Sequence, residues 1–164
     1  MTWLTRTVDM HKRSLRKLIG MSEVELTIQL PVPPTVSNVN PLFGSMIGET
    51  NQVGEIKGPF NCLWYDAYSA RTMGRGETSG IERVIESTPG QFRDATAFAE
   101  VWLQDILLDQ NNPAGQTWFD KALFVVCQGK KYKVLGYVKL GLSVSTPYSA
   151  VVGLKGGLGY DSTT

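Results

Sequence analysis

The residues that could carry out chemistry are few and widely spaced. His11 is the only histidine, so a Ser-His-Asp or Cys-His arrangement would have to use a side chain close to the N-terminus. A two-carboxylate hydrolase could draw on five aspartates: Asp66, Asp94, Asp105, Asp109 and Asp120. No two of them lie at a spacing that brings them together on one element, and most lie beside turns, where aspartate is common for backbone reasons. The sequence predicts no enzyme, and a carboxylate-based hydrolase stays a formal alternative.

Metal and cofactor signatures are not found either. Cys62 and Cys127 lie far apart without a Cys-x-x-Cys pair, whereas a structural zinc takes about four ligands. Two states of these thiols stay open, free in apolar strands or paired as a disulfide, and the base rate of reduced compartments favours the free state. The run 153–159 is rich in glycine, but it lacks the Gly-Lys-Ser/Thr ending of a P-loop and no helix is expected after it. We therefore expect no metal, no cofactor and a flexible tail over 155–164.

Cations and aromatic rings are interleaved in the C-terminal third, as in barrels that bind single-stranded nucleic acid. The residues concerned are Lys130, Lys131, Lys133 and Lys139 with Tyr132 and Tyr137. In strand alternation Lys131 and Lys133 face away from Tyr132, so rings and charges do not share a surface. The solvated face of a hairpin is the simpler interpretation. A single-strand nucleic-acid-binding β-barrel stays the alternative function, although the net charge of +1 gives it no general support.

The N-terminal 20 residues predict a basic amphipathic helix. They hold five Lys/Arg against one Asp, a net of +4, while the remainder holds eleven Lys/Arg against fourteen Asp/Glu, a net of −3. An apolar stripe recurs with helical spacing at Leu4, Val8, His11, Leu15 and Leu18, and Gly20 is a suitable stop. The cations fall on the opposite side: Arg6, Lys12, Arg13, Arg16 and Lys17. Two interpretations stay open, a helix packed on the body or a neighbour with a solvated basic side, or a basic helix that contacts nucleic acid or an acidic partner.

Residues 31–59 predict an extended loop or arm. Five prolines and four glycines interrupt regular structure there, and loops longer than about 12–15 residues are commonly functional or disordered. The segment nevertheless keeps apolar side chains at Val36, Val39, Leu42, Phe43, Met46 and Ile47. We infer a protruding arm that buries them on another subunit or partner. A loop folded back over its own core is the alternative.

The remaining sequence predicts short strands separated by Gly/Pro turns. Residues 22–30 alternate between apolar and polar, 60–68 are aromatic and strand-like, 96–104 alternate again, and 148–154 form a last strand. Two apolar runs within 118–138 flank Gly129-Lys130, which predicts a hairpin with a type II′ turn. No segment approaches the roughly 20 apolar residues of a membrane span. The expected fold is mainly β, a small antiparallel β-barrel or sandwich over 21–154 with an N-terminal helix and a long Pro/Gly-rich loop.

Residues 96–154 resemble the head-closure (head–tail joining) proteins of tailed bacteriophages. In that family an aspartate leads into an apolar strand, a Gly-x-x-Tyr-x-Val hairpin turn and a return strand. Asp120, Gly129, Tyr132 and Val134 occupy these positions here. The resemblance implies a non-catalytic virion protein of the phage neck, assembled in the host cytoplasm. It would form a homo-oligomeric ring beneath the portal, help to retain packaged DNA and present a surface to the tail.

The resemblance also implies partners: copies of the chain, the portal or adaptor protein, the tail-terminator or tail-tube protein and packaged DNA, without a membrane. The helix and the arm are longer than a minimal member needs, so a tail-terminator, adaptor or baseplate ring protein stays an alternative. The residues expected at the subunit or partner interface lie on the arm and the helix: Leu42, Phe43, Met46, Ile47, Arg13, Arg16 and Lys17.

Overall fold

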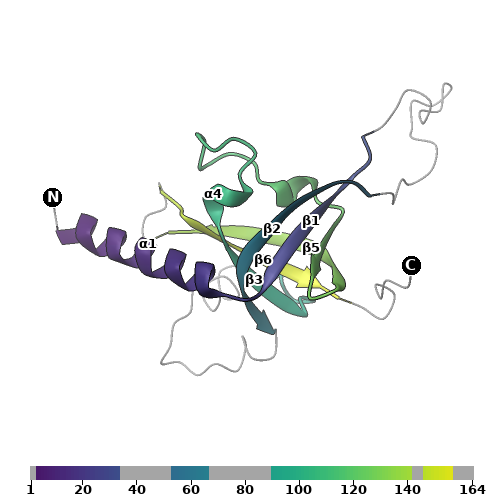
Figure 1. Cartoon of the computed structure of the whole chain (residues 1–164), viewed down its shortest axis with the longest axis horizontal. Helices are drawn as coiled ribbons and strands as arrows, with labels where there is room; N and C mark the ends of the chain where they lie inside the picture. Colours follow the sequence, from purple (N-terminus) through teal and green to yellow (C-terminus); the bar gives the residue numbers. More distant parts are fainter. Residues whose placement is uncertain (1–2, 34–52, 67–89, 142–145, 157–164) are drawn as a thin grey trace.

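The fold is a closed antiparallel β-barrel of six strands with a projecting N-terminal helix (Figure 1). The computed structural model describes residues 3–33, 53–66, 90–141 and 146–156. The strands, β1 (Glu25–Pro31), β2 (Val53–Asp66), β3 (Ala97–Trp102), β4 (Phe124–Cys127), β5 (Lys130–Leu140) and β6 (Ser149–Lys155), close in the order β1-β2-β3-β6-β5-β4. Short helical segments, α4 (Leu103–Ile106) and η2 (Trp118–Lys121), precede β4. The predicted mainly β barrel with an N-terminal helix is confirmed.

The barrel interior is filled by apolar side chains from every strand. Leu26, Ile28 and Leu30 of β1 point inward, which confirms the alternation predicted for this strand. Side chains without any exposed surface fill the middle of the core: Cys62, Ala99, Val101, Val125, Ala150, Val152 and Leu154. Such burial stabilises the fold by roughly 25 cal/mol per Å² of apolar surface removed from water. The barrel body is therefore a packed scaffold and not a channel.

Strand β3 differs from the predicted alternation because both of its faces are covered. Five consecutive residues from Ala97 are buried. Ala99 and Val101 face the barrel core, whereas Phe98 packs outside with Phe92 at 5.8 Å between ring centroids. A second, smaller apolar cluster therefore lies on the outer face of β3 and β6.

Strand β2 begins inside the segment predicted as an arm, which corrects the boundary at residue 59. It pairs with β1 along Val53–Asn61, and with β3 only from Cys62 onward. The first half of β2 thus has one edge that no described strand occupies. Pro59 lies at an irregularity in the pairing with β1, between the pairs Leu26–Phe60 and Ile28–Lys57, where a proline is tolerated. Residues 34–52 of the predicted arm lie outside the described residues.

The β4–β5 hairpin turn lies one residue earlier than predicted. Cys127 pairs with Lys130, so the two turn residues are Gln128 and Gly129. Both have positive φ, 50° and 75°, which is the signature of a type I′ turn and not the expected type II′ turn. At the other end of the chain, β6 includes Lys155, so the strand overlaps the first residue of the predicted tail, and residues 157–164 lie outside the described residues.

The two cysteines lie side by side in the barrel wall. Cys62 of β2 and Cys127 of β4 are both buried and form no disulfide in this structure. Contact with Cys127, together with burial, raises the pKa of the Cys62 thiol. Both sulfurs therefore act as small apolar groups of the core.

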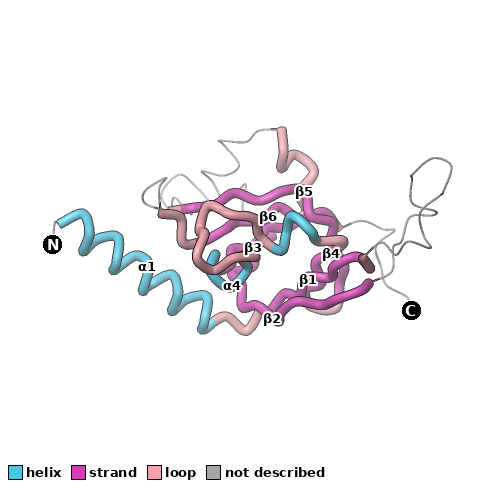
Figure 2. The backbone as a smooth tube through the Cα atoms, turned by 90° about the horizontal axis from the view of Figure 1, so that it is seen from above, coloured by secondary structure: helices cyan, strands magenta, loops and turns pink. Residues whose placement is uncertain are grey.

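Helix α1 (Trp3–Met21) confirms the predicted helix but buries a different stripe. Figures 1 and 2 show it leaving the barrel at its C-terminal end, with its N-terminal half extending away from the body. Leu15 and Ile19 are buried, whereas Leu18 is 56% exposed and His11 is exposed. Ile19, four residues after Leu15, completes the face that packs on the barrel, and Leu18 of the predicted stripe lies outside that face. No helix in the described ranges is long and apolar enough to cross a membrane.

Candidate interaction surface

Helix α1 is anchored to the barrel through its C-terminal half. Leu15 and Ile19 form a small apolar cluster with Tyr148, at the start of β6, and with Leu63 and Trp102 of β2 and β3. The N-terminal half of the helix extends past this cluster into solvent (Figure 2). Packing therefore fixes the C-terminal half of α1 on the barrel, and the N-terminal half projects from the barrel.

Two cations of α1 lie over aromatic rings where the helix joins the barrel. Lys12 Nζ lies 5.7 Å from the centroid of the Tyr148 ring, and the Arg16 guanidinium lies 5.6 Å from that of Trp102. Each such contact contributes about 0.5–1 kcal/mol at an exposed position. His11 Nδ1 is hydrogen-bonded to the Tyr148 hydroxyl. The single histidine and two of the five helix cations thus help to hold α1 in place.

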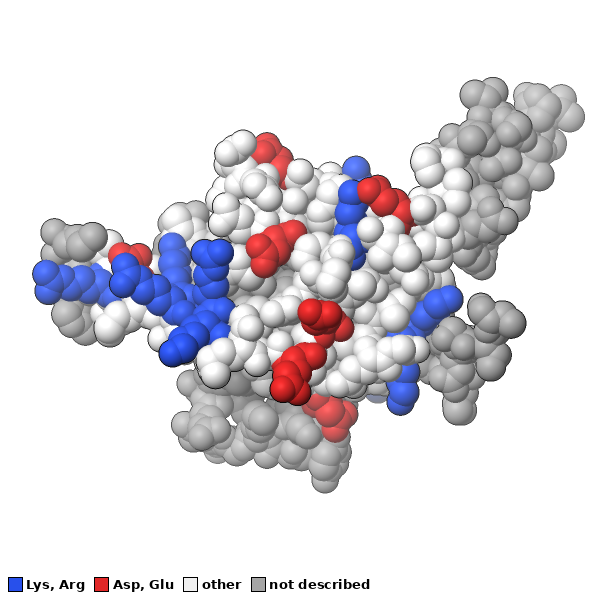
Figure 3. Space-filling view, in the orientation of Figure 1, with Lys and Arg blue, Asp and Glu red and all other residues white. Residues whose placement is uncertain are grey.

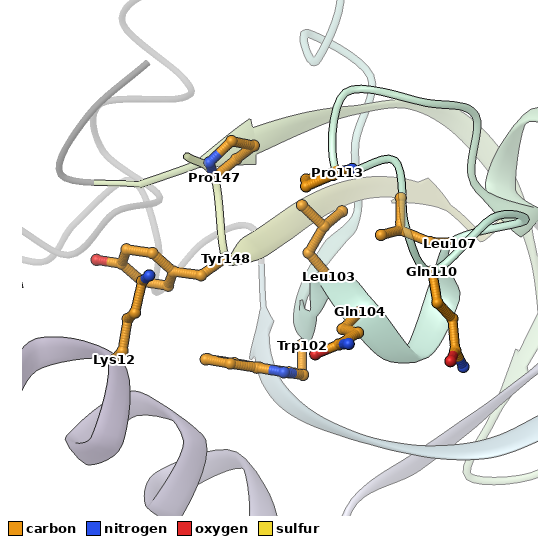
Figure 4. Close-up of a pocket in the computed structure, with 9 residues that line it drawn as sticks. All are labelled: Lys12, Trp102, Leu103, Gln104, Leu107, Gln110, Pro113, Pro147 and Tyr148. Carbon is orange, nitrogen blue, oxygen red and sulfur yellow. The ribbon is translucent and has the colours of Figure 1, made fainter. Parts of the chain in front are cut away.

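The junction contains a hollow of about 210 Å³ (Figure 4). Trp102, Leu103 and Leu107 line it from the barrel side, and Lys12 borders it from α1. It is smaller than the roughly 300–1,000 Å³ typical of small-molecule pockets. This hollow is therefore a packing defect between helix and barrel and not a convincing ligand site.

A larger hollow of about 420 Å³ adjoins it and shares Trp102 and Gln110. It holds Arg16 of α1 and Asp105 of α4 beside the free edge of β2. Burial raises the pKa of Asp105, and the Arg16 charge opposes that shift. A third hollow, of about 520 Å³, holds Asp120. None of these three hollows is lined by two carboxylates, which the hydrolase alternative requires.

The predicted interface residues divide into three groups. Arg13 and Lys17 are exposed and have no ion pair within the described part of the chain. Arg16 is exposed but stacks on Trp102. The four arm residues lie outside the described residues: Leu42, Phe43, Met46 and Ile47.

The sequence interpretation missed a second apolar stripe on α1. Met10, Leu18 and Met21 are 66%, 56% and 70% exposed. At 100° per residue, Met21 lies about 20° and Leu18 about 80° from Met10, which places all three on one side of the helix. A helical-wheel projection of 10, 18 and 21 could have found this stripe, which faces away from the barrel.

The residues that resemble the phage family form a structural brace. One Asp120 oxygen accepts hydrogen bonds from the Thr117 backbone N–H at 2.8 Å and from the Tyr137 hydroxyl at 2.7 Å. Tyr132 packs edge-on against Trp64, with ring centroids 5.2 Å apart. The hairpin tyrosines are thus packed against the protein. Asp120 therefore couples η2 to β5.

The most buried carboxyl is also tied to a neighbour. Glu100, on the outer face of β3, is 7% exposed and accepts a hydrogen bond from Ser149 Oγ at 2.9 Å. Burial raises its pKa, and the Ser149 bond opposes that shift. Within the described ranges, no group of three or more His, Cys, Asp or Glu side chains could hold a metal ion.

Comparisons of the chain with protein-family models, curated proteins and solved structures found no match. The fold and surface define a closed β-barrel that presents an amphipathic basic helix. The function is inferred below from that geometry.

Proposed function

We propose that the protein is a structural subunit of the neck of a tailed bacteriophage. Copies would form a ring that joins the portal to the tail and helps to retain packaged DNA. The observation that carries this proposal is the projecting helix α1, which leaves an apolar stripe exposed and two exposed cations, Arg13 and Lys17, without an ion pair among the described residues.

A half-anchored helix of this kind gains stability from a partner. Isolated helices shorter than about 12–15 residues are marginal in water, and the outer half of α1 is shorter than that. Met10 on this half keeps 66% of its surface exposed. A second protein surface would bury the stripe and support the helix. Together with the family resemblance of the hairpin, this favours a subunit of an assembly.

Three of the groups that could do chemistry are engaged in structural contacts. His11 is bonded to Tyr148, and Glu100 accepts from Ser149. Asp120 braces η2 against β5. A nucleophile, a base and an oriented third group are the usual parts of hydrolytic sites, and these contacts engage the candidates separately. They support a non-enzymatic role.

Mass measurement of the purified full chain, alone and after incubation with a portal ring, tests the proposal. A ring of several copies, free or seated on the portal, is the expected result. A chain that stays monomeric and joins neither portal nor tail components would contradict it.

The exposed cations of α1 favour one alternative, a nucleic-acid-binding barrel. That function predicts binding of single strands with an affinity that falls steeply with salt. The neck subunit predicts ring assembly whether or not single strands are present. Titration of a labelled single-stranded nucleic acid at low salt, with the double variant Arg13→Ala/Lys17→Ala beside the wild type, separates the two functions.

A further inference from the structure

The outer face of the β1–β2 ribbon is suited to receive a basic amphipathic helix. Gln29 of β1 pairs with Ile56 of β2, and because Leu26, Ile28 and Leu30 point inward, Gln29 and Ile56 lie outside. Ile56 is 58% exposed, and Val53 near the end of the ribbon is 38% exposed. The ribbon therefore carries an exposed apolar strip on its outer face.

Acidic side chains flank this strip at the other end of the ribbon. Glu25, the first residue of β1, and Glu23, two residues before it, are both exposed. The only cation in 22–33 and 53–66 is Lys57. Lys57 is engaged elsewhere, since its Nζ is paired with Glu55 and lies 4.5 Å from the Trp118 ring centroid. We call Glu23, Glu25, Val53 and Ile56 the acceptor surface.

Helix α1 carries the complementary pattern. Arg13 and Lys17 lie about 60° and 20° from Met10, on the side away from Leu18, at 100° per residue. The apolar stripe of Met10, Leu18 and Met21 is thus bordered by two exposed cations. In Figure 3, Lys and Arg are densest over α1, and most of the visible acidic side chains lie over the barrel.

Charge decides between two ways in which copies could bury this stripe. Packing α1 on the α1 of a second copy would place the cations of both helices along one seam, and juxtaposed like charges cost several kcal/mol. Packing α1 on the acceptor surface of a second copy sets cations beside Glu23 and Glu25 and apolar groups beside Val53 and Ile56. Only the second arrangement satisfies both patterns.

We infer that α1 of each copy packs across the β1–β2 acceptor surface of the next copy. This inference rests on the proposed ring function and specifies its subunit contact. The contact joins two different surfaces of the chain, α1 of one copy and the acceptor surface of the next. It is therefore heterologous, and a heterologous contact generates a ring when its rotation closes.

Reciprocal charge reversal of the full chain tests the contact. One variant is Arg13→Glu/Lys17→Glu, and the other is Glu23→Lys/Glu25→Lys. Each alone would face like charges at every contact, so its self-association, followed by light scattering after size exclusion, should weaken by at least about tenfold. An equimolar mixture restores opposite charges at every contact and should associate within about threefold of the wild type, in alternating copies.

Lys121→Glu/Lys130→Glu, at two exposed lysines outside both surfaces, is the matched control and should associate like the wild type. Circular dichroism verifies that each variant is folded. Assembly of the mixture is independent evidence that both charge-reversal variants are folded. If the wild type associates only on a portal ring, the same variants are compared in that complex.

Two results would overturn the inference while leaving the ring function intact. In the first, Arg13→Glu/Lys17→Glu assembles as tightly as the wild type, so α1 does not make the contact. In the second, both variants are impaired and the mixture stays dissociated, so α1 contacts another surface. A wild type that never self-associates, with or without a portal ring, would contradict the ring function itself.

Discussion

A pair of glycines on the outer face of the barrel gives a steric prediction. Gly153 of β6 and Gly136 of β5 pair across the sheet, and a Cβ at 153 would lie 2.2 Å from Cδ1 and 2.5 Å from Cε1 of Phe92. Phe92 is 3% exposed, so its ring must leave a packed position to make room. Overpacking costs about 1–3 kcal/mol, and burial of a Phe side chain is worth about 1.5–3 kcal/mol. We expect Gly153→Ala to lower the free energy of unfolding by about 2–3 kcal/mol.

Urea unfolding followed by circular dichroism measures this loss. With a slope of about 1–3 kcal/mol/M, the midpoint should fall by about 1 M without a change in slope. Gly90→Ala is the matched control, because a Cβ there meets nothing within 4 Å. Phe92→Ala should cost much less in the Gly153→Ala background than in the wild type, because the ring is already displaced. A Gly153→Ala midpoint equal to that of Gly90→Ala would refute the reasoning.

Three further predictions concern the brace, the buried carboxyl and the helix anchor. Asp120→Ala should lower the free energy of unfolding by about 2–3 kcal/mol, because the hydrogen bonds from the Thr117 N–H and the Tyr137 hydroxyl are lost. Asp109→Ala, which removes one exposed hydrogen bond, is the control. A loss for Asp120→Ala no larger than that for Asp109→Ala would contradict the brace. Burial raises the pKa of Glu100, so the contribution of this carboxyl to stability is greatest at low pH and is lost as pH rises through the folded-state pKa. Glu100→Gln should therefore raise the thermal midpoint more at pH 8 than at pH 4. An equal rise at both pH values would contradict the raised pKa. Leu15→Ala should speed the amide hydrogen exchange of α1 but not of the barrel, because it removes part of the apolar anchor of the helix. Leu18→Ala, at an exposed position, is the control. Unchanged exchange in Leu15→Ala would show that the anchor lies elsewhere.

Local pattern was sufficient to predict several elements. The alternation of β1 places Leu26 and Ile28 in the core because a half-buried strand repeats every two residues. The extent of α1 followed from its helical period and Gly20. The class of the fold followed from short strands separated by turns.

The sequence predictions were wrong where tertiary contacts determine which residues are buried and how far a strand extends. Phe98 is buried on the outer side of β3 in the outer cluster, and Glu100 is buried beside Ser149 of β6. The periodicity of a single strand contains no information on these neighbours. Strand β2 continues through Pro59 because its pairing with β1 is irregular there, which the sequence of one strand does not determine.

The candidate site was predicted in part. Charge alone identified Arg13 and Lys17, but the stacking of Arg16 on Trp102 joins positions 86 residues apart and has no local signal. The exposed stripe of Met10, Leu18 and Met21 was obscured by the choice of Leu18 for the packing face. The face that a helix buries depends on the partner surface, here Leu63, Trp102 and Tyr148.

Electron microscopy of the full chain incubated with a portal ring tests the central claim most directly. The proposed function predicts an added ring of density coaxial with the portal, with barrels joined by α1. Reversal of Arg13 and Lys17 to glutamate should abolish that ring. Portal particles without added density, together with a strictly monomeric free chain, would contradict the account.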